Sequence, residues 1–464
     1  IITITIVIII QDTGNCPCLL KKQAIMKITY FVSSLTLLTA SLIFVLSGEI
    51  FHAETSKIFW LFRQNFLFFS GCVAWCFMTL AMCLILRSPW LNRILKGLDK
   101  SWGLHKQAGI IATVFTLAHW LDEKIPHWLV QNGWLAHPGS LGSVQISSWQ
   151  SQLLCAGLLV AEWSTYLMIG LVLVSLVKKI PYNIFHFIHR LFPVFYLATA
   201  FHIFTVLFKT YWWNSPAGIL LVIVSIPGIY AAGLSLFNMI AYKNKRVAII
   251  TNIDYYPNDI IEITLHTDTP LLHTPGQFSF LTFQHDAEAH PFTIASYYQD
   301  KKHLRFAIKA LGDHTHSLKK ELKIGQDVIV EGPWGYLDFN IQSERQVWVA
   351  GGIGITPFIS QLEYLKNSGH PLCPIDLWYC VGQHDDLQYP VNLDLLCTAA
   401  GVTLHRIDAG MKLEAKHIMM ESDNSQNVHV WFCGPAGFAK SLLSGLQKYG
   451  ISEKAFHYDR FNMR

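Results

Sequence analysis

The stretch that decides the fold is "HRLFPVFYLATAFH", residues 189–202, in which two histidines enclose an almost wholly apolar run. Its composition is that of a membrane helix. It nevertheless carries two imidazoles and, at Pro193, a residue that removes one backbone hydrogen bond. His189 and His202 are either polar residues within a helical core or ligands of a group held in the membrane. The rest of the sequence favours the second interpretation.

The composition indicates one part in lipid and one part in water. Of the 464 residues, 52% are hydrophobic and only 14% are charged, with a mean hydropathy of +0.33, whereas an average soluble domain has about 25% charged residues. The net charge of +4, without a basic cluster among aromatics, gives no indication of nucleic-acid binding. The ten cysteines show no regular framework, which argues against structural disulfides. Residues 1–25 precede Met26 and are expected to be a leader without functional weight.

Six apolar runs predict six membrane helices, because a bilayer core of about 30 Å needs roughly 20 apolar residues per helix. They lie near residues 28–48, 65–86, 104–122, 153–176, 183–208 and 216–240. Lysines and arginines gather before the first run, between the second and third, between the fourth and fifth, and after the sixth. This bias predicts a multi-pass protein of the plasma (cytoplasmic or inner) membrane, with both termini and the soluble part in the cytoplasm. The third and fifth helices then run in the same direction.

Two histidine pairs lie at matching depths in the third and fifth expected helices. His105 and His119 are fourteen residues apart, and His189 and His202 are thirteen apart, which corresponds to about 21 and 19.5 Å along a helix. In parallel helices, His105 is therefore level with His189 near the inner face, and His119 with His202 near the outer face. Two facing imidazoles at one depth are the axial ligands of a six-coordinate haem b. The spacing predicts two such haems.

The rotation of the fifth helix leaves an alternative open. Each histidine could instead hydrogen-bond a neighbouring helix. At 100° per residue, thirteen steps leave His189 and His202 about 140° apart, so a straight helix could not turn both toward the third helix. Pro193 cannot donate to the carbonyl of His189. We therefore expect a bend or irregular turn at His189–Pro193 that brings both imidazoles toward the third helix.

After Arg246 the pattern changes to short alternating strands separated by Gly, Pro and Asn, which predicts a small antiparallel β-barrel. Within it, "HPFTIAS" (290–296) places Thr293 and Ser296 where they could hydrogen-bond the edge of a flat ring. The later "LGDHTHSLKKEL" places Gly312 and Thr315 just before a short helix, whose N-terminal amides could receive a pyrophosphate. Taken alone, each motif is equally consistent with a structural turn.

From about residue 345 strands and helices alternate, which predicts an α/β nucleotide-binding domain. In "QVWVAGGIGITPFISQLEYL" a buried strand, a glycine-rich turn and a helix follow one another, and Pro357 fits the first helical turn. Gly351, Gly352 and Gly354 would let the backbone approach a phosphate. "VHVWFCGPAGFAKSL" repeats this arrangement with Cys433 at a strand's carboxyl end, where a nucleotide ring lies in an open sheet. An ordinary buried cysteine is the alternative.

Together these residues resemble the ferric reductase/NADPH oxidase superfamily of transmembrane flavocytochromes b, from about residue 28 to the C-terminus. The membrane signature is similar: histidines fourteen apart on the third helix, beginning "HK", and thirteen apart on the fifth, beginning "H-x-L-F". The soluble signature is similar too, with "HPFT-x-A-S", "GGIGITP", "CGP" and a C-terminal aromatic residue. The combination is specific, although the single motifs are not.

The resemblance implies a fold of six helices holding two haems, followed by a ferredoxin-reductase-like module: an antiparallel β-barrel FAD domain and an α/β nucleotide domain. The expected domains are the leader 1–25, a haem domain 26–242, an FAD domain 243–343 and an NAD(P)H domain 344–464. The implied residues are His105 and His189 at the inner haem, His119 and His202 at the outer haem, His290, Pro291, Phe292, Thr293 and Ser296 around FAD, Gly351, Gly352, Gly354, Thr356 and Pro357 at the NAD(P)H phosphates, Cys433 with Gly434 and Pro435 near the nicotinamide, and Phe461 over the flavin ring.

The resemblance further implies transfer of electrons from cytoplasmic NAD(P)H through FAD and two haems to a small-molecule acceptor outside. That acceptor is either oxygen, giving superoxide, or a chelated ferric ion; a membrane partner that delivers electrons to another protein is the alternative function. Two departures bear on this. Glu123 stands four residues after His119, where superoxide-producing members resemble one another in having a histidine. "YCVGQHDDLQY" (379–389) lacks the arginine that usually clasps a 2′-phosphate, so both NADH and NADPH are kept open.

Overall fold

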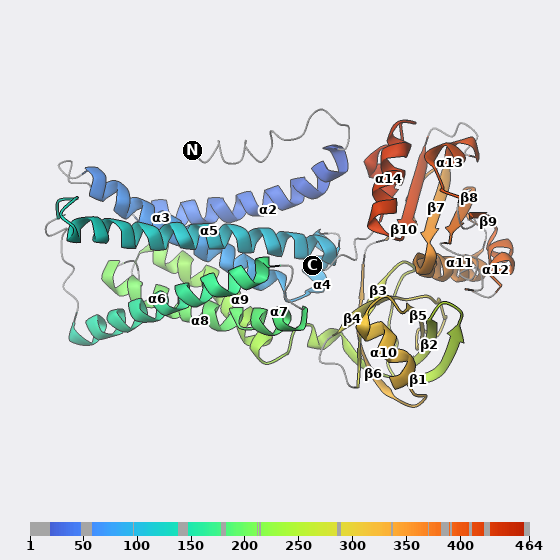
Figure 1. The fold of residues 1–464 in the computed structure, drawn as a ribbon, viewed down its shortest axis with the longest axis horizontal. Helices are drawn as coiled ribbons and strands as arrows, with labels where there is room; N and C mark the ends of the chain where they lie inside the picture. The colour runs from blue at the N-terminus through green and yellow to red at the C-terminus, as the bar shows by residue number, and fades with distance from the viewer. Residues whose placement is uncertain are drawn as a thin grey trace. The chain divides into compact units, whose positions relative to one another are not determined.

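The computed structural model divides the chain into two compact units (Figure 1). The helical unit comprises residues 27–95 and 100–240, and the sheet unit is formed mainly by residues from 241 onward. The structure describes residues 19–47, 58–95, 97–137, 147–177, 182–210, 212, 215–284, 289–335, 337–369, 371–381, 389, 392–407, 411–421 and 427–458. Most of the expected leader, residues 1–18, lies outside this part of the chain.

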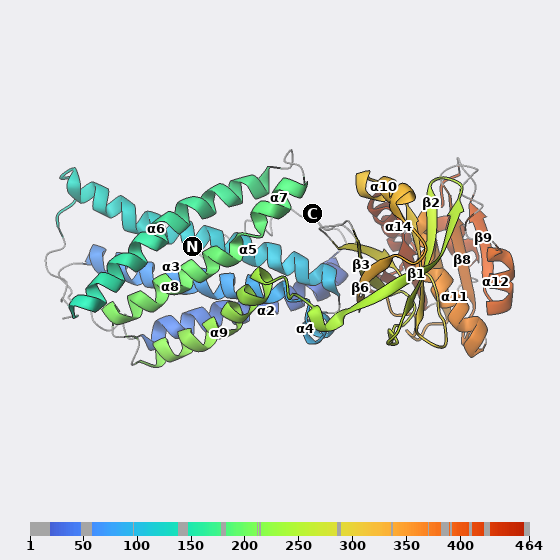
Figure 2. The same cartoon turned by 90° about the horizontal axis from the view of Figure 1, so that it is seen from below.

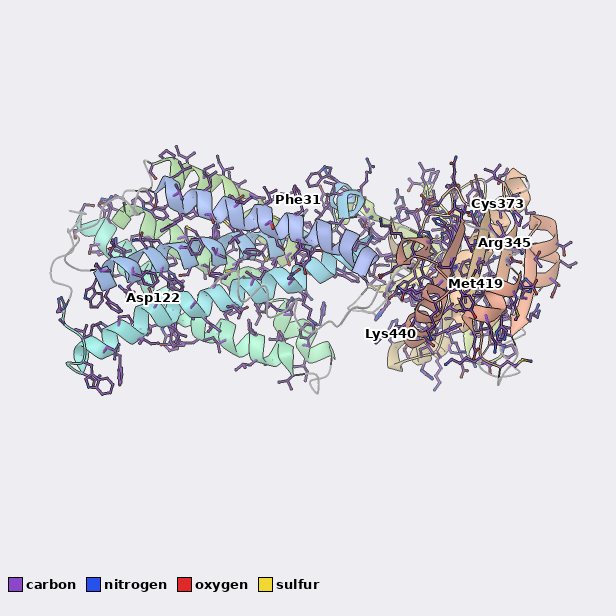
Figure 3. The ribbon with its side chains drawn as sticks, turned by 90° about the horizontal axis from the view of Figure 1, so that it is seen from above. Phe31, Asp122, Arg345, Cys373, Met419 and Lys440 are labelled. Atoms are coloured by element: carbon purple, nitrogen blue, oxygen red, sulfur yellow. The ribbon has the colours of Figure 1, made fainter. Side chains whose placement is uncertain are left out.

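The helical unit consists of long apolar helices. They are α2 (Leu19–Leu46), α3 (Ile58–Leu84), α4 (Pro89–Leu95), α5 (Leu98–Gln131), α6 (Ser148–Leu176), α7 (Tyr182–His189), α8 (Phe192–Thr210) and α9 (Pro216–Leu236). Large apolar side chains project outward from them, such as Phe31 on α2 (Figure 3), which is 68% exposed. An apolar outer surface of this kind suits lipid rather than water.

Five helical segments are long and apolar enough to cross a membrane, among the residues that the structure describes: α2, α3, α6, α7 with α8, and α9. The remaining one of the six expected helices is α5, which falls short of the others in apolar character. A helix does form at the third expected span, but α5 is more polar than the others. Only residues 107–121 separate its charged Lys106 from Asp122, which is shorter than the roughly 20 apolar residues of a typical span.

The fifth expected helix is broken where the sequence predicts an irregularity. α7 ends at His189 and α8 begins at Phe192, with a turn at residues 190–191 between them; Figure 2 shows the two as separate segments. Pro193 occupies the first turn of α8, where a missing N–H costs no hydrogen bond within the helix. The predicted break is confirmed.

Small residues allow the helices of this unit to pack closely. A Cβ atom on Gly157 of α6 would lie 2.0 Å from Oγ1 of Thr205 on α8, and one on Gly228 of α9 would lie 1.9 Å from the Tyr196 hydroxyl. The Tyr196 ring stacks on Trp75 of α3 with centroids 4.5 Å apart. α8 is thereby held on several sides, which fixes the height of the histidine that it carries.

The first half of the sheet unit is a closed antiparallel barrel, as the alternating sequence predicts. Its six strands follow the order β4-β3-β6-β1-β2-β5, and an antiparallel bridge between Ile294 and Phe306 joins the two ends of the sheet. The elements are η4 (Tyr242–Asn244), β1 (Lys245–Tyr256), β2 (Ile260–Thr267), β3 (Phe278–Phe283), β4 (His290–Thr293), β5 (His303–Lys309), α10 (Asp313–Glu321) and β6 (Asp327–Trp334).

The second half of the sheet unit is a doubly wound α/β domain. Its five parallel strands follow the order β11-β10-β7-β8-β9. The elements are β7 (Arg345–Gly351), η5 (Gly352–Ile355), α11 (Thr356–Ser368), β8 (Ile375–Cys380), α12 (Leu393–Ala400), β9 (Thr403–Ile407), α13 (Ala415–Glu421), β10 (Val428–Cys433), α14 (Ala436–Gln447), η7 (Glu453–Ala455) and β11 (Phe456–His457).

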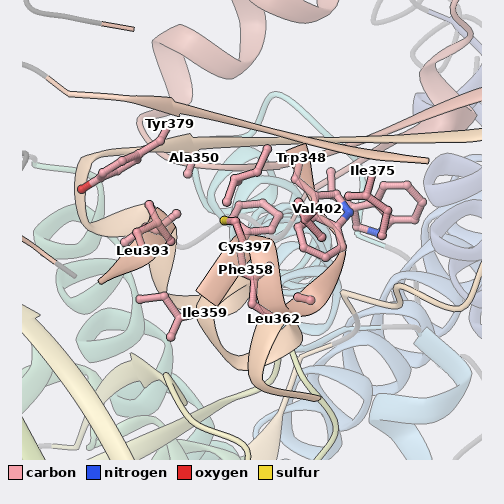
Figure 4. Packing of buried hydrophobic residues seen from close by; sticks show 14 of the residues in the cluster. Trp348, Ala350, Phe358, Ile359, Leu362, Ile375, Tyr379, Leu393, Cys397 and Val402 are labelled. Carbon is pink, nitrogen blue, oxygen red and sulfur yellow. The ribbon is translucent and has the colours of Figure 1, made fainter. Parts of the chain in front are cut away.

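Each face of the parallel sheet has its own apolar core. On one face, Phe358 and Leu362 of α11 pack with Cys397 of α12 against Trp348 of β7 (Figure 4). The opposite face is covered by α13 and α14. Burial on both faces forces the strands to be continuous apolar runs and leaves their carboxyl ends as the edge at which a ligand can bind.

Candidate functional site

The two histidines of α5 are oriented by backbone carbonyls of α3. Nδ1 of His105 donates to the Ala81 carbonyl at 2.9 Å, and Nδ1 of His119 donates to the Leu67 carbonyl at 2.9 Å. These two carbonyls are fourteen residues apart, as are the two histidines. A proton on Nδ1 leaves Nε2 as a free lone pair, which is the arrangement of a metal-binding imidazole held by a neighbouring acceptor.

The two histidines from α7 and α8 complete the pairs at the expected levels. The ring centroids of His105 and His189 are 6.0 Å apart, and His119 and His202 are close enough to interact electrostatically. Nδ1 of His189 and Nδ1 of His202 are buried and have no hydrogen-bond partner among the described residues.

The spacing of His105 and His189 fits a bis-imidazole haem. With metal–nitrogen bonds of about 2 Å, an imidazole–metal–imidazole arrangement separates the ring centres by about 6 Å, close to the distance between His105 and His189. In the part of the chain that the structure describes, no three His, Cys, Asp or Glu side chains gather as a metal site. In a haem the porphyrin provides the other iron ligands, so two histidines are enough and no third protein ligand is needed.

The position of His119 depends on a glycine and lies beside charged residues. A Cβ atom on Gly71 of α3 would lie 3.2 Å from Cε1 of His119, so only glycine lets this ring rest on α3 without displacement. At the same end of α5, Arg63 forms an ion pair with Glu123, and its Nε donates to the Asp122 carbonyl at 3.0 Å; Figure 3 marks Asp122 on α5. Glu123, four residues after His119, is therefore engaged in an ion pair.

In the barrel, the expected ring-binding motif at 290–296 and the expected pyrophosphate-binding motif that contains Gly312 and Thr315 are brought together. His290 on β4 and His314 on α10 stack with centroids 3.6 Å apart and an interplanar angle of 18°. Sequence reasoning did not single out His314. Without knowledge that α10 folds back over β4, nothing in its local sequence indicated this contact. The stack places the start of α10 beside "HPFT".

The polar residues of these motifs already have partners within the barrel. Thr315 Oγ1 accepts from the backbone N–H groups of Leu311 and Gly312 at 2.9 and 3.1 Å, so it caps the start of α10. Ser296 is fully buried, and its hydroxyl accepts from the Arg305 N–H at 2.9 Å. Ser296 thus fixes the segment that follows β4 from inside the barrel. Pro291, Phe292 and Thr293 lie on β4, which pairs with β3.

The two glycine-containing turns of the α/β domain pack directly on each other. β7 and β10 are adjacent, with Ala350 opposite Cys433. A Cβ atom on Gly354 would lie 2.2 Å from the Cys433 carbonyl oxygen, and one on Gly434 would lie 3.1 Å from Cα of Gly351. Gly352 has φ +55°, a conformation that favours glycine.

The neighbours of these turns complete the edge at which a nucleotide could bind. Thr356 and Pro357 begin α11, and Pro435 precedes α14. On the adjacent strand, burial raises the pKa of Cys380 to about 12, so its thiol stays protonated. Phe461 and residues 382–388, in which the missing arginine was noted, lie outside the described residues.

Comparison with known proteins identifies the family. A family model named "Ferric reductase like transmembrane component" matches residues 70–200, and one named "FAD-binding domain" matches residues 245–351. These matches, together with ferric reduction oxidases among the relatives, support the ferric reductase/NADPH oxidase superfamily. The observed architecture agrees with it: apolar membrane helices, an antiparallel FAD-binding barrel and an α/β nucleotide-binding domain.

The relatives match this chain in part. "Ferric reduction oxidase 8, mitochondrial" of Arabidopsis thaliana is 28% identical over 290 residues, which are 59% of this chain and 35% of the relative. The carnitine monooxygenase reductase subunit of Escherichia coli is 23% identical over 184 residues, 40% of this chain and 52% of the relative. The match thus spans about a third of the length of the plant protein.

Among solved structures, the FAD/NAD-binding domain of the Vibrio cholerae nitric oxide dioxygenase is similar to the soluble part of this chain. Its sequence identity is 16% and its TM-score 0.41, with coverage of 47% of this chain and 98% of that domain.

Proposed function

We propose that this superfamily member is a multi-pass oxidoreductase of the plasma (cytoplasmic or inner) membrane. In this proposal electrons from cytoplasmic NAD(P)H pass by way of FAD and two b-type haems to a small-molecule acceptor on the outer side. The observation that carries the proposal is the double tier of histidines. His105 and His119 each use Nδ1 to contact an α3 carbonyl and face a second buried imidazole from α7 or α8.

The residues of this chain have distinct tasks in the proposed function. The four histidines hold the haem irons at two depths, and the α3 carbonyls of Ala81 and Leu67 fix the orientation of two of them. The bound cofactors supply hydride acceptance and one-electron carriage, chemistry that side chains do not provide. The barrel positions the flavin through β4 and the start of α10, and the paired glycine turns bring backbone amides to the NAD(P)H phosphates.

For the acceptor we propose a chelated ferric ion, because the plant relatives are named ferric reduction oxidases. The local structure supports this choice. Glu123 stands where superoxide-producing members resemble one another in having a histidine, and here it forms an ion pair with Arg63. Oxygen is the second candidate acceptor. Assays of ferric-chelate reduction and of superoxide in sealed vesicles separate the two.

The test of the electron path is the haem content of histidine variants. The purified protein should show the absorption spectrum of a low-spin b-type haem, with two haems per chain, and NAD(P)H should reduce it without oxygen once FAD is supplied. His105→Leu and His119→Leu should each lower the haem content to about one per chain, because each removes one of two axial ligands of a single site. FAD content should not change, since the barrel is untouched.

Two results would contradict the proposal. A wild-type protein without haem absorbance would exclude the histidine assignment. Variants that keep two haems with unaltered spectra would show that these histidines are only hydrogen-bonded helix residues. His127→Leu, in the last turns of α5 and outside both pairs, is the matched control and should keep both haems.

A further inference from the structure

Helix α11 is attached to the segment that follows the flavin-site strand β4. The Ser360 hydroxyl donates to the Ser296 carbonyl at 2.8 Å, and Glu363 accepts from the Tyr297 N–H at 2.7 Å. Ser360 and Glu363 are three residues apart and therefore share one face of α11. Two side chains of the nucleotide-binding domain thus hold two consecutive backbone groups of the barrel.

Arg305 of β5 strengthens this attachment from within the barrel. Its Nη2 donates both to Glu363 and to the Ala295 carbonyl, the latter at 2.8 Å, and its Nε lies 3.5 Å from Glu262 of β2. The Tyr389 hydroxyl donates to the same Glu262 carboxylate at 2.9 Å. We call Glu262, Arg305, Ser360, Glu363 and Tyr389 the clasp.

The clasp is shielded from water, which makes its charges interdependent. The side chains of Arg305, Glu363 and Glu262 are only 21%, 20% and 11% exposed. Burial raises the pKa of Glu262, and Arg305 opposes that rise. Burial also disfavours the charge on Arg305, but the two carboxylates raise its pKa above the ordinary value. Removing one of the charged members, Glu262, Arg305 or Glu363, leaves a poorly solvated charge on another, so these three act as a unit.

The clasp connects the two elements that must be aligned for hydride transfer. Ala295 is two residues beyond Thr293, the end of β4. Glu363 is seven residues, about 10 Å of helix, beyond Thr356, which begins α11 directly after the glycine turn. A rigid helix and a short strand therefore link the clasp to the expected NAD(P)H and FAD sites. Neither the cross-domain partners nor their geometry could be read from local sequence.

We propose that the clasp sets the position of the nicotinamide-binding turn relative to the flavin-binding strand, with Glu363 and Arg305 as positioning residues; this rests on the proposed function. In the transfer, the C4–H bond of NAD(P)H breaks and its hydride carries two electrons to the flavin, so that NAD(P)H is oxidised to NAD(P)⁺ and FAD is reduced. Misplacement of reacting groups by about 1 Å can slow such a step about 100-fold.

The test uses Glu363→Gln in the purified full-length protein. Under anaerobic stopped-flow conditions, flavin reduction by NAD(P)H should slow by about ten- to a hundredfold. The kinetic isotope effect of NAD(P)H deuterated at C4 should rise, because hydride transfer becomes more rate-limiting. FAD content and chemical reduction by dithionite should stay unchanged. In FAD-free protein, deuterium exchange at the peptide containing Tyr297 should accelerate, since that amide loses its carboxylate acceptor.

Three further variants keep the test decisive. Ser360→Ala removes one contact without exposing a charge and should show the same changes, smaller in size, even if Glu363→Gln fails to fold. Glu363→Asp keeps the charge and should recover part of the rate. Arg406→Met breaks the exposed Arg406–Asp394 pair of the same domain and should change nothing.

The outcomes separate this inference from the proposed function. If the wild-type flavin is reduced by NAD(P)H but Glu363→Gln and Ser360→Ala match its rate and isotope effect, the clasp has no positioning role. If the wild-type flavin is not reduced at all, the proposed function fails, and the role in hydride transfer fails with it. Faster exchange at Tyr297 would in that case mark the clasp as purely structural.

Discussion

At the scale of single residues, the close contact between the two glycine turns requires a residue without a side chain. Gly354 lies so close to Cys433 that a methyl group would fall 2.2 Å from a backbone oxygen, which cannot move like the end of a side chain. Gly354→Ala should therefore separate the turns after β7 and β10. We expect a loss of about 1–3 kcal/mol in the free energy of unfolding, as for other overpacked sites, and an increase in KM for NAD(P)H with unchanged FAD content.

A glycine of the same domain provides the control. Gly437 lies in α14, and a Cβ atom there would meet no heavy atom within 4 Å. Gly437→Ala should leave KM unchanged and stabilise the fold by about 0.4–1 kcal/mol, because alanine restricts the unfolded chain. Thermal unfolding and NAD(P)H titration of both variants measure the difference. Equal behaviour of the two would show that the close approach of the turns has no effect on the nucleotide site.

At the scale of elements, features that follow from helix periodicity can be predicted from the sequence. Contacts between segments distant in the chain cannot. Helix spacing places the four histidines at two depths, and the phase conflict together with Pro193 predicts the break between α7 and α8. The role of the Ala81 and Leu67 carbonyls could not be predicted, because every residue has a backbone carbonyl group. The stack of His290 on His314 and the clasp join segments that are distant in the chain, so no local pattern encodes them. α5 is also more polar than the other long helices, so length and composition alone do not mark it as a membrane span.

The break between α7 and α8 yields a prediction of its own. Pro193→Ala restores an N–H that can bond to the His189 carbonyl, which favours one continuous helix. Such a helix would turn His189 and His202 about 140° apart. Because Thr205 and Tyr196 pack α8 against α6 and α9, α7 should be the part that rotates. We expect the haem content to fall from two toward one per chain, with loss at the inner site.

A proline elsewhere in the helical unit provides the control for replacing proline by alanine. Pro227 lies inside α9, and none of the four histidines is on that helix. Pro227→Ala should therefore keep both haems. Haem content and the redox titration of each purified variant provide the measurement. A Pro193→Ala protein with two haems and wild-type midpoint potentials would mean that the turn at residues 190–191 is fixed by packing and not by the proline.

At the scale of the whole molecule, the proposed path requires that the donor and the acceptor meet opposite faces of the membrane. The histidine tiers are about 21 Å apart along α5, so the two haems would cover most of a hydrocarbon core of about 30 Å. Lys243, Lys245 and Arg246 follow α9, and the positive-inside bias therefore predicts a cytoplasmic position for the nucleotide-binding part. Electron transfer should therefore be vectorial, and neither substrate needs to enter the lipid.

Sealed vesicles test this sidedness and the acceptor together. In inside-out vesicles, NAD(P)H added outside should reduce a membrane-impermeant ferric chelate trapped in the lumen, whereas chelate added outside should be reduced only after detergent opens the vesicles. The reaction should persist without oxygen, because the proposed acceptor is iron. His119→Leu should stop it by removing a ligand of the outer haem while NAD(P)H still reduces the flavin. Lumenal superoxide in place of ferrous iron would identify oxygen as the acceptor, and reduction of external chelate by intact vesicles would contradict a path across the membrane.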